Sequence, residues 1–178
     1  FYVDVGAFDG LKNSKTLLFE RNNWDGLCIE PHPTSFKKLM RNRSCIKENV
    51  LISDFNGVCD FWYSEKAPMT SRVNMSGVRK RIHKMDDVKK IKSKCFKLNC
   101  LCEKLNISKI DFLKIDVEGH DASIINSINF DLLSISVIMY EQWAGQHENG
   151  YKRAEKKLSL SGYKLIHSNQ ENKIWSKI

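Results

Sequence analysis

Residues 1–10 read FYVDVGAFDG, an apolar run that carries two acids, Asp4 and Asp9, and two glycines, Gly6 and Gly10. A short apolar run stopped by glycine is typical of a strand buried on both faces of a parallel sheet. A glycine turn after such a strand lets the backbone approach a bound molecule without a Cβ clash. The stretch therefore predicts a central strand followed by a ligand-binding loop.

Strand and helix patterns alternate along most of the chain. The first half predicts a helix at 11–23, a strand at 26–29, a helix after the N-cap Thr34, a strand at 48–52 and a hairpin strand at 58–65. Order resumes at residues 95–99, and the second half predicts a helix at 101–110, a strand at 111–117, a helix at 121–129, a strand at 134–142, a helix at 151–161 and a closing hairpin at 163–178. This order predicts an α/β fold with a mostly parallel sheet and an antiparallel strand from the final hairpin.

Length and composition favour a single domain spanning residues 1–178, because 178 residues suffice for one core but not for two. No window contains the roughly 18 consecutive apolar residues that a bilayer span needs. The chain opens on Phe1 inside an expected strand, so a targeting segment or a further domain could precede it.

Six cysteines lie in segments that read as core, and we expect buried free thiols, with disulfides or a structural metal as alternatives. This pattern suits a reducing compartment, and we predict a cytoplasmic location.

Positive charge is concentrated in one segment, residues 68–97, which we interpret as a basic insert or lid. Between Arg72 and Lys97 there are ten Lys or Arg residues and two acids, so this stretch alone accounts for the formal net charge of +8. Such a segment would attract an anionic acceptor, such as a phosphorylated glycan, a nucleotide sugar or RNA. A solvated loop is the plainer alternative. Phe96 is the one interleaved aromatic, which weakens the case for a nucleic-acid partner.

The opening loop lacks both common phosphate-binding patterns, G-x-G-x-x-G and G-x-x-x-x-G-K-S/T. Its acids would repel a pyrophosphate but suit a ligand that carries an amine and a sulfonium cation. The second expected strand ends in Glu30, twenty residues beyond Gly10, where a carboxylate can accept both hydroxyls of a ribose. Together these features suggest S-adenosylmethionine (SAM) as the cofactor.

Four segments, FYVDVGAFDG, LCIEPHP, IDFLKIDVEGHDASII and VIMYEQ, resemble the FkbM-type family of SAM-dependent methyltransferases. The most specific of them is LKIDVEGHD, and the resemblance covers nearly the whole chain apart from the insert. It implies a Rossmann-like class I methyltransferase fold with a seven-stranded sheet and helices on both faces. The family often has Glu where this chain has Asp121.

Carried over by position, the resemblance implies that the opening loop lines the methionine end of SAM, that Glu30 holds the ribose, and that the end of the third strand flanks the adenine. The implied cofactor-binding residues are Asp4, Gly6, Ala7, Asp9, Gly10, Glu30, Asn49, Val50 and Asp116.

Alternation along 112–117 puts Lys114 and Asp116 on one face of the strand, with Glu118 and His120 just beyond its end. Methyl transfer to an alcohol benefits from a base, so a site rich in carboxylates favours oxygen as the acceptor atom. We expect Asp116 and Glu118 to position the acceptor hydroxyl, with Asp116, Glu118 or His120 as the base.

Three residues are the expected substrate contacts: Lys114, Glu141 and Trp143. Each catalytic or substrate residue has a structural alternative: Asp116 could cap the following helix, His120 could be solvated at its start, Lys114 could pair internally with Asp4 or Asp116, and Trp143 could simply pack. We assign no metal, although Asp116, Glu141 and His147 together could hold Mg²⁺.

The sequence thus predicts a SAM-dependent O-methyltransferase that acts on a hydroxyl of a sugar or glycan, with a small-molecule or glycan acceptor that the insert would allow to be anionic. Two alternatives stay open. One is an RNA ribose 2'-O-methyltransferase that uses the basic insert, and the other is an inactive methyltransferase-like binding domain.

Overall fold

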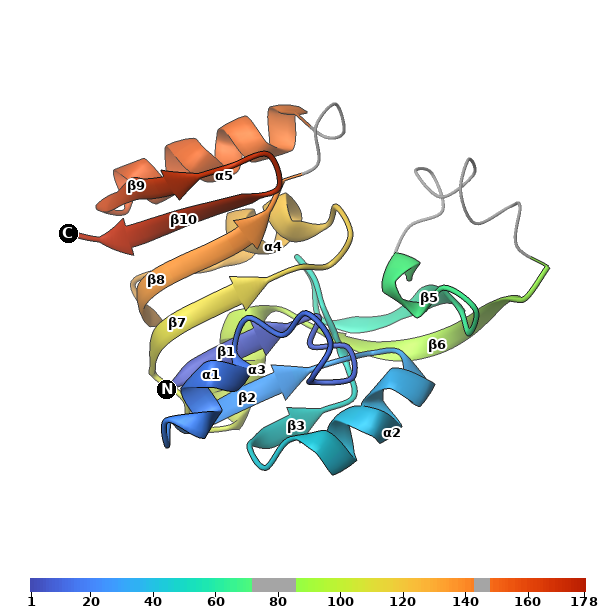
Figure 1. The fold of residues 1–178 in the computed structure, drawn as a ribbon. Helices are drawn as coiled ribbons and strands as arrows, with labels where there is room; N and C mark the ends of the chain where they lie inside the picture. Colours follow the sequence, from blue (N-terminus) through green and yellow to red (C-terminus); the bar gives the residue numbers. More distant parts are fainter. Residues whose placement is uncertain (72–85, 143–147) are drawn as a thin grey trace.

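The computed structural model describes residues 1–71, 86–142 and 148–178 (Figure 1). Its main sheet has seven strands in the order β3-β2-β1-β7-β8-β10-β9. They are β1 (Tyr2–Val5), β2 (Gly26–Ile29), β3 (Ile46–Glu48), β7 (Lys109–Ile115), β8 (Ser134–Glu141), β9 (Tyr163–Ser168) and β10 (Asn172–Lys177). The strands from β3 to β8 pair in parallel, while β10 runs antiparallel to both β8 and β9. The predicted Rossmann-like sheet with an antiparallel strand from the closing hairpin is confirmed.

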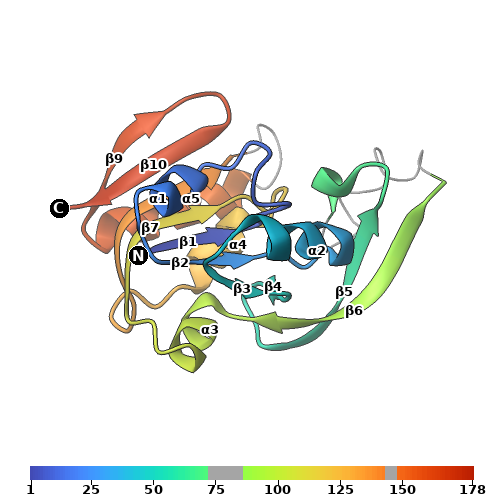
Figure 2. The same cartoon turned by 60° about the horizontal axis from the view of Figure 1, so that its bottom comes forward.

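Helices cover both faces of this sheet, because the buried strands carry apolar side chains on alternate sides. On one face, Val3 and Val5 of β1 share a core with α3 (Leu98–Lys104), α4 (Asp121–Ser127) and α5 (Glu148–Leu160). On the other face, Tyr2 packs with side chains from α1 (Leu17–Arg21) and α2 (Pro33–Asn42). Figures 1 and 2 show these layers around the central strands. Within the described ranges, no helix is both long and apolar enough to span a bilayer.

Two predicted helix starts were wrong. The N-cap of α2 is His32, not Thr34, because the His32 Nδ1 atom accepts the N–H groups of Thr34 and Ser35. The first helix begins at Leu17, since a left-handed residue at Asn13 keeps the preceding stretch in turns. Thr16 precedes α1 but does not cap it, because its hydroxyl donates to Asp4 instead.

A second sheet of three strands, in the order β4-β6-β5, adjoins the first. The third strand expected from the sequence is in fact two: β3 pairs in the main sheet, and β4 (Leu51–Ile52) pairs with β6 (Val88–Phe96). The hairpin strand expected at 58–65 is β5 (Gly57–Ser64), which pairs antiparallel with β6. The β5–β6 pair extends away from the main sheet on the side of α2 (Figures 1 and 2).

Regular secondary structure returns at β6, which begins at Val88 and not at residues 95–99 as the sequence predicted. Part of the basic insert is therefore a strand. Lysines alternate with Ile91, Ser93 and Cys95 along β6, and Ile91 and Cys95 pack with Phe61 on β5. Lysine is depleted in strands, so the charged side of this pattern concealed its apolar side. A short 3₁₀ turn, η1 (Pro68–Thr70), lies at the other end of the insert. Residues 72–85 lie outside the described part of the chain.

Candidate active site

A pocket opens at the carboxyl ends of β1, β2 and β7, where the strand order reverses on either side of β1. Ligands of open parallel sheets bind at such a switch point. The space inside the pocket, with its open mouth and the solvent there included, is about 850 Å³. Its lining combines apolar residues of β1, β2, β4 and β5 with charged residues, which are Asp4, Lys12, Glu30, Lys114, Asp116 and Glu118.

Gly6 brings the first loop into direct contact with the end of β7. Its φ is +83°, and a Cβ atom there would lie 1.9 Å from the carbonyl oxygen of Asp116. The N–H groups of Gly6 and Ala7 both donate to the carbonyl of Ile29 on β2. Only glycine therefore allows this turn, which draws the ends of three strands together.

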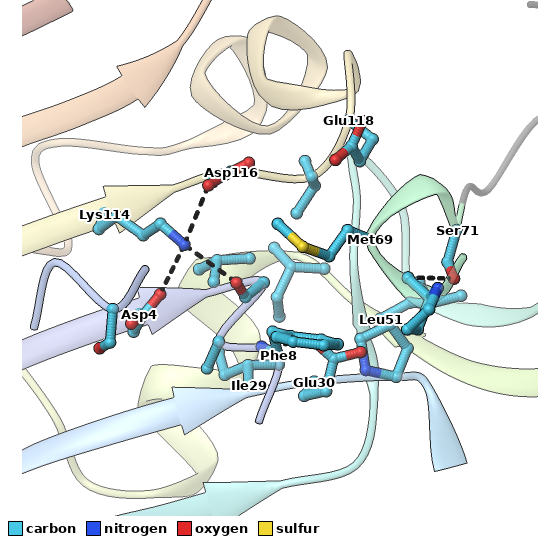
Figure 3. A pocket seen from close by; sticks show the side chains of 18 of the residues that line it. Asp4, Phe8, Ile29, Glu30, Leu51, Met69, Ser71, Lys114, Asp116 and Glu118 are labelled. Carbon is cyan, nitrogen blue, oxygen red and sulfur yellow. Dashed lines mark hydrogen bonds and ion pairs between the residues drawn. The ribbon is translucent and has the colours of Figure 1, made fainter. Parts of the chain in front are cut away.

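The ammonium group of Lys114 lies between the carboxylates of Asp4 and Asp116 (Figure 3). Its Nζ atom lies 3.0 Å from Asp4 Oδ1 and 3.3 Å from Asp116 Oδ2, and it donates to the carbonyl of Gly6 at 2.9 Å. Burial alone would lower the pKa of Lys114, but the two carboxylates outweigh it and raise that pKa. Because Asp4 faces Lys114 directly in the β1–β7 register, this pair ties the two central strands together.

Glu30 follows β2 and is buried in the wall of the pocket. Its Oε2 atom accepts the N–H of Phe8 and its Oε1 atom accepts the N–H of His32, both at 2.8 Å. Burial raises the pKa of Glu30 to about 7, and these two hydrogen bonds oppose that shift. Phe8, whose N–H donates to this carboxylate, adopts a left-handed φ of 53°.

The rest of the first loop, which follows β1, is held by its own side chains and by Arg43, the residue after α2. Asp9 Oδ1 accepts the N–H groups of Leu11 and Lys12 at 3.0 and 2.8 Å, so this carboxylate faces its own loop. Arg43 donates to the carbonyl of Gly10 at 3.2 Å. Asp9 and Gly10 therefore shape the loop from outside the pocket lining, and their predicted contact with a cofactor stays a prediction.

Asp116 and Glu118 lie on the opposite side of the pocket from Glu30 (Figure 3). The Asp116 side chain is 41% exposed, which makes it accessible from the pocket mouth. Met69 of η1 lies across the pocket, so the start of the basic insert forms part of the wall. Asp116 does not occupy the cap position of α4, because the N-cap residue of that helix is His120.

Two polar residues after β7 lie outside the pocket lining. The Nε2 atom of His120 lies 2.8 Å from Ser53 Oγ, so His120 links the start of α4 to the end of β4. Asp121 is fully buried, and burial together with the charge of Asp116 raises its pKa well above the usual range.

Of the other predicted site residues that the structure describes, one lines the pocket and the others lie outside its lining. Val50 lines the pocket, whereas Asn49 donates to the carbonyl of Glu30 at 2.7 Å and braces the pocket from outside. Glu141 ends β8 outside the lining. Trp143, like His147 of the alternative Mg²⁺ site, lies outside the described residues. Among the residues that are described, no three His, Cys, Asp or Glu side chains could hold a metal ion.

Sequence reasoning missed several lining residues, among them Phe8, Lys12, Phe61 and Met69. The first two lie in the glycine loop, whose whole length could have been included. Phe61 lies on the side of β5 that packs with β4 and β6, which alternation along the expected strand could have revealed. Met69 had no signal, because only the fold brings the start of the insert over the pocket.

The strand order, the single antiparallel strand and the pocket at the switch point define the class of Rossmann-like methyltransferase folds. The family model described as the methyltransferase FkbM domain matches residues 4–165. The chain therefore belongs to the FkbM methyltransferase family, and the resemblance seen in its sequence is confirmed. The chain matches none of the curated proteins with which it was compared.

Proposed function

We propose that this methyltransferase uses SAM and transfers a methyl group to a hydroxyl of a sugar or glycan. The observation that carries the proposal is the placement of Glu30 and Asp116 on opposite sides of one pocket at the switch point of the sheet. One carboxylate suits the ribose of the cofactor, and the other suits the proton of an acceptor.

The residues present fit the nucleoside part of SAM. Each Glu30 oxygen accepts one backbone N–H and keeps further lone-pair capacity, so the carboxylate can also accept from two ribose hydroxyls. Apolar side chains of the lining, including Val50, Leu51 and Phe61, would contact the flat adenine ring.

The residues present also fit the methionine part. Asp116 and Glu118 place negative charge near the first loop, where the cofactor carries an ammonium and a sulfonium group. The glycine turn at Gly6 leaves no Cβ atom between this loop and a ligand. Asp4 would contribute only indirectly to cofactor binding, because its carboxylate forms an ion pair with Lys114 and accepts a hydrogen bond from Thr16.

When bound, SAM supplies an electrophilic methyl group on a good leaving group. The protein must then align the acceptor oxygen and accept its proton. Asp116 is best placed for both tasks, with Glu118 on the same side of the pocket. His120 hydrogen-bonds to Ser53 away from the lining, so we rank it third as a base.

The charges around the pocket favour an uncharged acceptor. Four carboxylates and two lysines line the described walls, so a phosphorylated acceptor would meet net negative charge. The alternative of RNA ribose methylation gains no support from Lys114, because Lys114 is paired with Asp4 and Asp116. We place the reaction in a reducing compartment such as the cytoplasm, in line with six free thiols.

The test is to offer the purified protein labelled SAM with neutral oligosaccharides, phosphorylated oligosaccharides and capped RNA. Label in the neutral oligosaccharides supports the proposal, whereas label in RNA alone overturns the choice of acceptor. Asp116→Asn should lower turnover by about tenfold or more, a larger loss than the one it causes in cofactor affinity. Failure of the wild-type protein to bind S-adenosylhomocysteine in calorimetry would contradict cofactor use and favour an inactive binding domain.

A further inference from the structure

The methionine part of the methyl donor carries a negative group as well as positive ones. At neutral pH its α-carboxylate is ionised, as is the carboxylate of the product S-adenosylhomocysteine. In a pocket with four carboxylates, a cation beside this group would offset the like charge that the ligand meets there. The described lining contains two cations, Lys12 and Lys114.

Lys114 is not available for this role. Three partners surround its ammonium group, which donates to the Gly6 carbonyl and forms ion pairs with Asp4 and Asp116. Its side chain is 8% exposed, so turning toward a ligand would leave Asp4 buried without its counter-ion.

Lys12 differs from Lys114 in each of these respects. It is an exposed residue of the first loop, and among the described residues no ion pair or hydrogen bond involves its ammonium group. Its backbone is nevertheless fixed, because Asp9 accepts its N–H at 2.8 Å and Arg43 holds the loop at Gly10. The loop thus presents an uncommitted cation from a fixed position beside the pocket.

We propose that Lys12 forms the carboxylate-binding subsite of this pocket and pairs with the α-carboxylate of the methyl donor. The inference rests on the proposed function, since it assumes that the pocket receives SAM. It assigns a role to a residue whose side chain is not needed for the fold.

The experiment compares two ligands that differ by the carboxylate alone, S-adenosylhomocysteine and its decarboxylated analogue S-adenosyl-3-thiopropylamine. Their dissociation constants are measured by calorimetry for the wild-type protein, Lys12→Ala and Lys12→Arg. Lys12→Ala should weaken S-adenosylhomocysteine by about tenfold, the usual loss for a hydrogen bond to a charged group, and leave the analogue almost unchanged. Lys12→Arg should restore most of the loss, because it keeps the charge.

The matched control is Lys15→Ala, which removes an exposed lysine from the same loop, outside the pocket lining. It should change the dissociation constant of neither ligand, and it therefore separates a general effect of net charge from a direct contact of Lys12 with the carboxylate. Equal weakening of both ligands by Lys12→Ala, or no weakening of either, would overturn the inference while leaving SAM binding intact. If the wild-type protein binds neither ligand, the proposed function fails and this inference fails with it.

Discussion

Two charge clusters in this protein have opposite charge patterns: one is a cation between two acids, and the other is an acid between two cations. In the interior cluster, Lys114 lies between two carboxylates, Asp4 and Asp116, at 3.0 and 3.3 Å. In the cluster on the β5–β6 pair, Asp60 lies between Lys90 and Lys92, at 2.6 and 2.7 Å. The outer ion pairs are the shorter ones, yet their side chains are 32%, 44% and 71% exposed. In the interior cluster Lys114 and Asp4 are 8% and 1% exposed, and only Asp116, at 41%, reaches solvent.

The difference teaches that burial, rather than distance, decides what an ion pair contributes. Water and salt screen the outer pairs, and each of those charges is solvated without its partner. Asp4 has no such alternative, because its carboxylate is enclosed between β1, β7 and Thr16. The interior cluster should therefore govern stability and the shape of the site, and the outer cluster should govern neither.

The largest expected effect comes from removing the central cation of the interior cluster. Lys114→Met should lower the free energy of unfolding by about 3–5 kcal/mol, because it leaves Asp4 buried without a counter-ion. Urea denaturation measures this change. Adding Asp4→Asn to Lys114→Met should recover part of the loss, and a single variant as stable as the wild type would remove the distinction between the clusters.

The backbone beside the interior cluster provides the second test. Gly6→Ala should cost about 3 kcal/mol, because its Cβ would overlap the carbonyl of Asp116 at a left-handed φ of +83°. Gly119→Ala is the matched control, since Gly119 has a φ of +96° but open space around the added Cβ. It should cost only about 1 kcal/mol. Equal losses in urea denaturation would mean that conformation, and not contact with β7, requires glycine at position 6.

The third test concerns Glu30, a buried carboxylate that lacks the close counter-ion that Asp4 has. Its pKa is raised to about 7, so the fraction able to accept from ribose hydroxyls falls as the pH drops below 7. The dissociation constant for S-adenosylhomocysteine should rise about tenfold from pH 8 to pH 6. Calorimetry at both values measures the change.

Glu30→Gln should bind more weakly and with little dependence on pH over this range. In the ligand-free protein the same shift has a stability consequence, since the unfolded state releases this proton first. Stability should therefore fall as the pH rises from the ordinary value of 4.5 toward about 7. A pH-independent affinity in the wild type would exclude Glu30 from the ligand contact.

The smallest expected effect lies in the outer cluster. Asp60→Asn removes the carboxylate that Lys90 and Lys92 share, although both lysines remain solvated. At about 0.15 M salt the urea midpoint should stay within experimental error of the wild type. A clear loss of stability would show that these exposed ion pairs stabilise the fold despite screening by water and salt.

Most of the main sheet was predictable because its strands carry a local signal. β1, β2, β7 and β8 are apolar runs that end in acids or turn residues, and their existence followed from the sequence. The N-cap of α2 was missed because a histidine ring nitrogen can replace the Thr34 hydroxyl as acceptor. β6 was missed because its apolar side is visible only once β5 lies beside it.

For the candidate site, the sequence by itself determined the residue types and their order: a glycine loop, an acid after the second strand, and the LKIDVEGHD segment that belongs to the FkbM family. Only the tertiary structure decided which partners these charged side chains find within the protein and which of the side chains line the pocket. It turned Asp4 toward Lys114 and Asp9 toward its own loop, and it left Asp116 and Lys12 at the pocket. The physical reason is that a carboxylate's partners depend on which strands become neighbours and on how much water remains, and neither is encoded in local spacing.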